Sequence, residues 1–276
     1  MSVCTESEII RLLAKHGLPT ATPERGPYEG VVNEVWLAGD VVVRVNKNLN
    51  YESDVWTETV AVPALIEGGI NTPQLLVFDH DFDIVDRLIT IYERAPGIPL
   101  SKVTNLENPA QFFFDLGQCI RSFHDRVKEV EDPKILLDQA WSIEEEVSIS
   151  WFGGLAPEFI RRSEETEPTV FCHQDLHPDN ILVHEGKLST VIDWGDAGWA
   201  GASVDLRYIP ARFLPKALEG YGEISSEMIR RIVILQIDQL KYAEQNSRSY
   251  GLFGDSTREE IETFMNSALR AIENLG

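Results

Sequence analysis

Residues 173–180 read His-Gln-Asp-Leu-His-Pro-Asp-Asn, and the tripeptide Asp-Trp-Gly at 193–195 begins thirteen residues after Asn180. The four residues before this segment, Thr-Val-Phe-Cys at 169–172, predict a short buried strand that runs into it. Pro178 prevents a helix from continuing through the segment, because proline lacks a backbone N–H and clashes with the preceding turn. The sequence therefore predicts a buried strand that ends in an irregular loop rich in polar side chains.

Two further strands are predicted after this loop, at residues 181–184 and 188–192. Glu-Gly-Lys joins them, and a short glycine-containing connection between apolar runs is typical of a hairpin. Because a hairpin brings its two ends together, Asn180 at one end and Asp193 at the other are expected to lie close enough to share one cation.

The oxygen-bearing side chains of these segments suit phosphoryl transfer. An enzyme for this reaction mainly positions the acceptor hydroxyl, holds Mg²⁺ on the phosphates and neutralises developing charge. Asp175 would accept the proton of the hydroxyl, and Asn180 would offer its amide oxygen to Mg²⁺. Asp193 would supply the anionic oxygen that Mg²⁺ prefers. The pattern therefore favours a kinase.

Two other interpretations of the loop are open. Asp, Asn, His and Pro are common turn residues, so the segment could be only a polar surface loop. His173 and His177 are four residues apart, which on a helix would suggest a zinc pair. The predicted strand and Pro178 argue against a helix there.

The patterns His-x-Asp-Leu-His-Pro-x-Asn and Ile-Asp-Trp together resemble the aminoglycoside phosphotransferase and related small-molecule kinase family, which is similar in fold to protein kinases. The resemblance implies an α+β fold of two lobes. The small, nucleotide-binding lobe, residues 1–96, would hold an antiparallel sheet and a helix. The large, mainly helical lobe, residues 97–276, would bind the acceptor and carry catalysis. Asp175 is implied as the catalytic base, with Asn180 and Asp193 as Mg²⁺ ligands.

The resemblance also implies supporting residues. His173 corresponds to the loop histidine that braces the backbone in protein kinases, and Asp205 would brace the same loop. Asp196 is expected to face the acceptor. The family usually has Gly-Asp-Pro before the Asp-Leu pair that corresponds to Asp205-Leu206. Here Ala202-Ser203 stand in place of Asp-Pro, so the similarity is incomplete at this point.

In the small lobe, residues 31–45 alternate in hydrophobicity with a break at Gly39-Asp40, which predicts a hairpin. Its second strand resembles the third small-lobe strand of kinases, and Arg44 stands where the family has a phosphate-binding lysine. Arginine stays cationic and can bind phosphate bidentately, although it does not simply replace lysine. Residues 56–66 resemble the regulatory helix, which implies that Glu58 pairs with Arg44. An exposed arginine on an edge strand and an ordinary exposed glutamate are the alternatives.

Residues 88–97 predict a core strand that leaves into a linker. By resemblance this is the hinge, where Glu93 and Ala95 would offer backbone groups to the nucleobase and Tyr92 would be the gatekeeper. ATP is the expected nucleotide, and GTP would be favoured if Tyr92 narrows the adenine pocket. Core packing is the alternative role for Tyr92. The segment 26–30, Gly-Pro-Tyr-Glu-Gly, could form a turn over the phosphates.

Apolar residues at three- and four-residue spacing predict helices in the rest of the chain. One of them has a continuous apolar face, with His124 beside it as a structural histidine that has no evident partner nearby in the sequence. The predicted helical segments are 5–16, 111–127, 229–242 and 257–275.

The formal net charge of −21 would repel nucleic acids and anionic membranes. An acidic cleft would attract a small, hydroxylated, cationic substrate. The acidic stretch 131–167, with Trp141, Trp151 and Phe152, falls where such kinases place variable helices over the acceptor, and aromatic faces with carboxylates suit a cation. Solubility, and tryptophans buried in an ordinary core, are the alternative explanations.

Three cysteines, at positions 4, 119 and 172, form no Cys-x-x-Cys pair, so neither a disulfide framework nor a zinc ribbon is expected. Residues 1–30 contain no long apolar run, which argues against a secretory signal and a membrane span. We expect a cytoplasmic protein that is a monomer or a weak dimer.

Three functions are open on the sequence alone. The first is an ATP- or GTP-dependent kinase of an aminoglycoside-type antibiotic, which would confer resistance. The second is a metabolic kinase of choline, an amino alcohol or a sugar derivative. The third is a nucleotide-binding module without turnover, which Arg44 and the lack of a Gly-x-Gly-x-x-Gly loop make conceivable.

Overall fold

The computed structural model describes residues 2–27, 32–47, 49–130, 167–222 and 224–273. Most of the predicted acidic stretch therefore lies outside the described residues, including Trp141, Trp151 and Phe152. The same holds for Tyr28, Glu29 and Gly30 of the predicted phosphate-covering turn.

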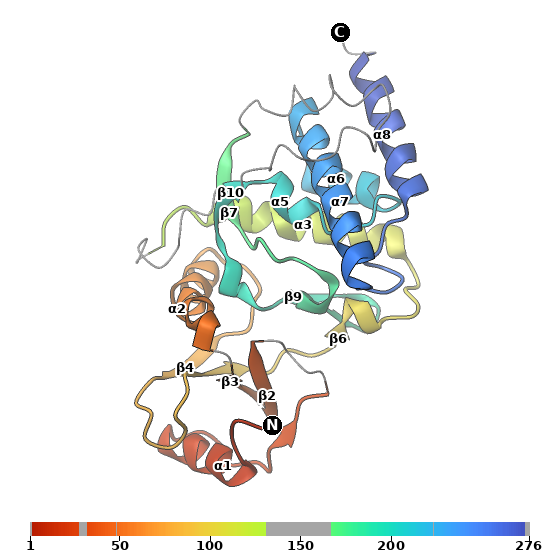
Figure 1. The fold of residues 1–276 in the computed structure, drawn as a ribbon. Coiled ribbons are helices and arrows are strands. Elements are labelled where there is room, and N and C mark those ends of the chain that lie inside the picture. Colours follow the sequence, from red (N-terminus) through yellow and green to blue (C-terminus); the bar gives the residue numbers. More distant parts are fainter. Residues whose placement is uncertain (1, 28–31, 48, 131–166, 223, 274–276) are drawn as a thin grey trace.

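An antiparallel five-stranded sheet occupies one end of the molecule, and helix α1 packs beside it (Figure 1). The predicted hairpin is confirmed, with Gly39 at φ 60° in its turn. The predicted first helix is also confirmed, and Thr5 and Glu8 form a capping box at its start. Ile9, Leu12 and Leu13 of α1 share a buried cluster with the sheet. The elements are α1 (Glu6–Lys15), β1 (Glu24–Arg25), β2 (Asn33–Ala38), β3 (Val41–Asn46), β4 (Leu75–Asp79) and β5 (Ile89–Glu93), in the sheet order β1-β2-β3-β5-β4.

Helix α2 (Glu52–Glu67) connects this sheet to the rest of the molecule. A short 3-10 turn, Leu49–Tyr51, precedes it. Ala61, Val62 and Leu65 of α2 belong to the largest buried cluster, which extends through the helical end of the molecule. The first turns of α2 lie against the Trp194–Asp196 turn, where a Cβ on Gly195 would crowd Asp54. Residues near Asp193 are thus packed directly against the small-lobe helix.

The predicted hairpin after the catalytic segment is also confirmed. Strands β8 (Ile181–His184) and β9 (Lys187–Val191) pair with each other, and β6 (Ile98–Pro99) pairs with β8 on its other side. The strand predicted at 169–172 is β7 (Thr169–Cys172), which pairs with β10 (Gly198–Gly201). Between β5 and β6 the chain passes from one sheet to another, and Gly97 lies so close to Val183 that a side chain would not fit.

The remaining predicted helices are present, and they form the end of the molecule opposite the five-stranded sheet (Figure 1). None of the helices in the described part of the chain is long and apolar enough to cross a membrane. The helices are α3 (Pro109–Arg126), α5 (Ser203–Leu206), α6 (Leu214–Tyr221), α7 (Ser226–Asn246) and α8 (Arg258–Glu273).

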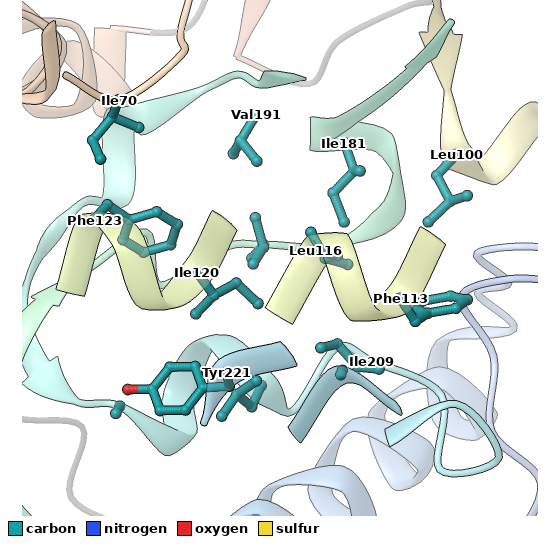
Figure 2. Packing of buried hydrophobic residues seen from close by; sticks show 14 of the residues in the cluster. Ile70, Leu100, Phe113, Leu116, Ile120, Phe123, Ile181, Val191, Ile209 and Tyr221 are labelled. Carbon is teal, nitrogen blue, oxygen red and sulfur yellow. The ribbon is translucent and has the colours of Figure 1, made fainter. Parts of the chain in front are cut away.

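Helix α3 is the centre of this core. Figure 2 shows its apolar side chains lying between the β8–β9 region on one side and Tyr221 and Ile209 on the other. Phe113, Leu116 and Ile120 of α3 are almost completely buried. This core positions β7 and the loop that follows it, because β7 packs on α3.

Two glycines allow α3 and α6 to approach closely. A Cβ on Gly117 of α3 would collide with the backbone carbonyl of Ala217, and a Cβ on Gly220 of α6 would collide with that of Phe114. Each helix therefore presents a glycine to the backbone of the other. The close packing that results puts Tyr221 within reach of His124.

We expect Gly117→Ala to destabilise the protein. On an open helix surface this change would stabilise by about 1 kcal/mol. Here the new methyl group must push the helices apart, and overpacking of this kind costs about 1–3 kcal/mol or more. A fall in Tm of about 5 °C or more in thermal unfolding is the expected result.

The control is Gln118→Ala on the exposed face of the same helix, which should leave the Tm within about 2 °C. An unchanged Tm for Gly117→Ala would show that the helix contact is not tight.

Candidate active site

Asp205 of α5 fixes the backbone of the segment after β7. Its two carboxylate oxygens accept the backbone N–H groups of His173 (2.9 Å) and Gln174 (2.8 Å). Asp205 is fully buried, and His124 Nε2 lies 2.9 Å from the same carboxylate. Burial acts to raise the pKa of Asp205, but the hydrogen bonds from His124 and from the loop hold it below its usual range. The Asp205 carboxylate therefore stays ionised, so both of its oxygens can accept a backbone N–H.

His124 is a buried histidine whose two partners were not evident from its neighbours in the sequence. Its ring nitrogens contact Asp205 and the hydroxyl of Tyr221 (2.9 Å). Both partners come from distant segments, so spacing along the chain gave no sign of them.

Among the described residues, His124, Cys172 and Asp205 are the group with ligand atoms near enough to hold a metal, within 4.8 Å of one another. Burial raises the pKa of the Cys172 thiol, which opposes the thiolate that a metal needs. Both oxygens of Asp205 are already occupied by backbone N–H groups. We therefore interpret this group as a hydrogen-bonded brace.

His173 ties the loop to the end of β9. Its Nδ1 accepts the backbone N–H of Asp175 (3.2 Å), so the ring proton is on Nε2, which donates to the carbonyl of Ile192 (2.9 Å). The backbone bracing implied for this histidine and for Asp205 agrees with these contacts.

Asp175 lies in the loop between β7 and the Pro178–Asn180 turn, with 38% of its side chain exposed. Its Oδ1 accepts the hydroxyl of Tyr208 (3.2 Å), and its Oδ2 lies 3.2 Å from His177 Nε2. Burial acts to raise the pKa of this carboxyl, but hydrogen bonds from His177 and Tyr208 hold it below its usual range. The Asp175 carboxyl is therefore ionised at neutral pH.

Asn180 and Asp193 are brought together by the hairpin. The backbone N–H of Ile192 donates to the carbonyl of Asn180 (3.0 Å), and Asp193 is the next residue. The Asn180 amide nitrogen donates to the backbone carbonyl of Asp175 (2.8 Å), which leaves the amide oxygen to bind a cation. Asp193 has φ 67°, an uncommon left-handed conformation for a non-glycine residue, and strain of this kind is often found at functional sites.

Arg44 on β3 links the small sheet to Asp193. Its Nη1 donates to Glu58 Oε1 (2.5 Å) and its Nη2 to Asp193 Oδ1 (2.6 Å). Asn33, with its amide oxygen turned towards Arg44, accepts from Nη2 at 2.7 Å. The alternatives of an exposed arginine and an exposed glutamate were wrong, because 14% of the Arg44 side chain and 3% of the Glu58 side chain are exposed.

The network around Arg44 also includes Tyr92. Its hydroxyl donates to Glu58 Oε2 (2.7 Å), and the Arg44 guanidinium lies 5.8 Å from its ring centroid. Burial acts to raise the pKa of Glu58, whereas Arg44 and Tyr92 oppose this effect. Tyr92 is buried in the core, and its hydroxyl holds the Glu58 carboxylate in place.

The hinge residues lie at the end of β5. The backbone N–H of Glu93 donates to the carbonyl of Gln74 (3.0 Å) and is used within the sheet. Ala95 lies in the connection between β5 and β6, half-buried. Their contacts with a nucleobase stay predictions.

Asp196 shares the site with three other carboxylates, and one of them was not anticipated from the sequence. Although Asp196 is exposed at the surface, desolvation by the surrounding groups first, and then the charges of Asp175, Asp54 and Asp193, raise its pKa to about 7. Asp54 comes from the start of α2, and its own pKa is raised mainly by burial. It is four residues before Glu58 on the same helix face, which is the signal that could have identified it.

This crowding of carboxylates fits a bound Mg²⁺. Oxygen ligands from carboxylates and an amide are the set that Mg²⁺ takes in proteins. A divalent cation between Asn180 and Asp193 would also relieve the repulsion that raises the pKa of Asp196. Asn180 and Asp193 are therefore the residues that would hold the ion.

A cavity of about 200 Å³ lies between α7 and residues 248–256. Tyr208 lies in its wall and also contacts Asp175, so the cavity adjoins the predicted base. Tyr250 of the wall stacks on His177, with ring centroids 5.1 Å apart. No pattern in the sequence pointed to Tyr208 or Tyr250.

We expect the Asp196→Asn variant to be more stable than the wild type at pH 8 and to lose this advantage at low pH. A raised pKa means that the folded protein binds this proton more tightly than the unfolded chain does, so the wild type loses stability as pH rises between about 4 and 7. The asparagine side chain does not ionise, so the variant does not lose stability in this way as the pH rises.

The measurement is Tm against pH without nucleotide or Mg²⁺. Asp86→Asn is the matched control, because 92% of the Asp86 side chain is exposed. A difference between Asp196→Asn and the wild type that stays constant across this range would contradict the assignment.

Comparisons with known proteins agree with this geometry. A model of the phosphotransferase enzyme family matches residues 25–228. No curated protein sequence matches the chain significantly. Similar solved structures include the GDP complex of a wild-type aminoglycoside 2'-phosphotransferase-IIIa, a macrolide 2'-phosphotransferase from Brachybacterium faecium, and a choline/ethanolamine kinase family protein from Mesorhizobium loti.

The similarity to each of these structures extends over most of both chains. The aminoglycoside enzyme is 17% identical with a TM-score of 0.63, and the alignment covers 99% of this chain and 100% of the other. The macrolide enzyme is 18% identical with a TM-score of 0.61 and coverages of 87% and 93%. The choline/ethanolamine kinase family protein is 17% identical with a TM-score of 0.55 and coverages of 96% and 95%.

These similarities confirm the α+β, protein-kinase-like fold predicted from the sequence. The family model confirms the predicted family. Since the family model matches residues 25–228 of 276, this chain belongs to the phosphotransferase enzyme family.

Proposed function

We propose that this phosphotransferase uses Mg²⁺ and a nucleoside triphosphate, ATP or GTP, to phosphorylate a hydroxyl of a small cationic molecule of the aminoglycoside type. The main observation in support is that Asp175, Asn180 and Asp193 lie together beside the buried Arg44–Glu58 pair. Similar structures include a GDP complex and a ternary complex with streptomycin and ATP. We place the enzyme in the cytoplasm, where nucleoside triphosphates are available.

In this mechanism Asp175 acts as the general base. It accepts the proton of the acceptor hydroxyl as that oxygen bonds to the γ-phosphorus and the bond to the leaving diphosphate breaks. Mg²⁺, held by Asn180 and Asp193, would neutralise charge on the phosphates. Arg44 is fixed through Nη1 to Glu58 and presents Nη2 at Asp193, where it can also contact a phosphate oxygen.

Acidic side chains around the base support a cationic acceptor. Asp54, Asp193 and Asp196 lie near Asp175, and one Mg²⁺ neutralises only part of their charge. The net charge of −21 acts in the same direction at longer range. If the acceptor is an aminoglycoside, the enzyme would confer resistance to it.

A smaller acceptor, such as choline or an amino alcohol, is the second candidate. The cavity that Tyr208 lines measures about 200 Å³, which is small for a multi-ring antibiotic. Tyr208 and Tyr250 lie in its wall, and aromatic faces suit a quaternary or primary ammonium group. Turnover across a panel of aminoglycosides, macrolides and amino alcohols, at equal concentration, would separate the two.

We expect Asp175→Asn to lower kcat by about a hundredfold or more, because the general base is lost. Nucleotide affinity should change little, since Asp175 is not among the proposed Mg²⁺ ligands. Phosphate transfer and nucleotide titration by calorimetry are the measurements.

Asp193→Ala should instead remove Mg²⁺-dependent nucleotide binding.

Asp86→Asn serves as the control for both variants, because Asp86 is exposed and distant in sequence from the catalytic segments. Full turnover by Asp175→Asn would overturn the base assignment and leave a nucleotide-binding module as the better description. Unchanged Mg²⁺ dependence in Asp193→Ala would remove Asp193 from the metal site.

Salt should slow the capture of a polycationic acceptor. Raising the ionic strength from about 20 mM to several hundred shortens the screening length several-fold, so kcat/KM should fall several-fold. The turnover number should change less, because contacts inside the closed site are poorly screened. A kcat/KM that does not depend on salt would leave the acidic charge as a determinant of solubility.

A further inference from the structure

We propose that Tyr208 and His177 are positioning residues that hold the two oxygens of the Asp175 carboxylate from opposite sides and aim Oδ1 at an acceptor in the adjoining cavity. This inference rests on the proposed function, and it assigns roles to two residues outside the proposed catalytic and metal-binding set.

His177 holds Oδ2. Its Nδ1 accepts the backbone N–H of Asp179 (3.2 Å), so the proton of the neutral ring lies on Nε2, which faces Asp175 Oδ2 at 3.2 Å. The ring stacks on Tyr250, at an interplanar angle of 23° and a centroid distance of 5.1 Å. Both the tautomer and the ring plane are thus fixed by neighbours, and Nε2 is held close to the carboxylate.

Tyr208 holds Oδ1. Its hydroxyl donates to Asp175 Oδ1 (3.2 Å), and its oxygen accepts from Arg207 Nη2 (2.8 Å). Arg207 Nη2 also donates to the carbonyl of Gln174 (3.2 Å), which fixes it to the same loop. Burial raises the pKa of Tyr208, so the phenol stays protonated and remains a donor. A charge-assisted hydrogen bond of this kind is stronger than one between neutral groups.

The two contacts differ in their surroundings. Oδ2 lies on the side of Asn180, whose amide nitrogen is 3.5 Å away, and so faces the proposed Mg²⁺ ligands. Oδ1 lies on the side of Tyr208, which is in the cavity wall. A carboxylate oxygen has lone pairs for two donors, so Oδ1 can receive an acceptor hydroxyl while Tyr208 stays bound. An acceptor in the cavity that Tyr208 lines would therefore approach Asp175 from the Oδ1 side.

The experiment compares Tyr208→Phe with the wild type, using the best acceptor from the panel and Asp175→Asn as the reference background. Loss of a hydrogen bond to a charged group should lower kcat about tenfold or more. The KM for the nucleotide should stay within about twofold, because Tyr208 lies on the acceptor side of Asp175. In the Asp175→Asn background the same substitution should cost almost nothing, since both changes act through one group.

His177 provides a second, independent variant. His177→Phe keeps an aromatic ring for the stack on Tyr250 but removes the donor, and should lower kcat to a similar degree. His177→Gln retains an N–H that can reach Asp175, so it should recover much of this loss. Tyr242→Phe, on the exposed part of α7, is the neutral control. Melting temperatures within about 2 °C of the wild type would show that the variants fold.

The outcomes separate the two proposals. Wild-type turnover that depends on Asp175, together with full activity in Tyr208→Phe and His177→Phe, would overturn the positioning roles alone. A Tyr208→Phe effect of equal size in the wild-type and Asp175→Asn backgrounds would show that Tyr208 does not act through Asp175. A wild-type protein without Asp175-dependent turnover on any acceptor would overturn the proposed function and this inference with it.

Discussion

The buried carboxylate of Asp205 is the interaction on which the site depends. A loop that leaves a strand inside the protein has backbone N–H groups without partners, and leaving them unpaired would cost free energy. Asp205 accepts two of these groups, from His173 and Gln174, and is itself held by His124. The loop can therefore keep a conformation in which Gln174 has φ 67° and Asp175 reaches the solvent. The helix packing of α3 and α6 sets this brace in place, because it brings Tyr221 to His124.

A second network joins the two ends of the molecule. Arg44 comes from the small sheet, Glu58 from α2, and Asp193 from the end of the β9 strand. Because the Arg44–Glu58 pair is buried, removal of one partner would leave an uncompensated charge, which typically costs 3–5 kcal/mol. Tyr92 donates to the second oxygen of Glu58, and Asn33 accepts from Arg44 Nη2. Arginine in place of the usual lysine is thus accommodated by neighbours that satisfy its additional N–H groups.

Several carboxylates that repel one another lie together in the site. Desolvation first, and then the charges of Asp175, Asp54 and Asp193, raise the pKa of Asp196 to about 7. A structure that gathers like charges loses stability unless a bound cation compensates for them. The same groups that make the empty arrangement unfavourable would therefore favour Mg²⁺ and a cationic acceptor. The carboxylates proposed to serve cation binding therefore lower the stability of the site when no cation is bound.

The sequence by itself determined the strand, loop and hairpin around residues 169–192, because turn chemistry and short apolar runs act locally. It also determined the long helices and the pairing of Arg44 with Glu58, which the family resemblance implied. Only the tertiary structure decided which side chains surround Asp175. Tyr208, Tyr250 and Asp54 come from separate elements, and His124 meets Asp205 across 81 residues. Such contacts depend on how whole helices pack, and neither periodicity nor spacing along the chain carries that information.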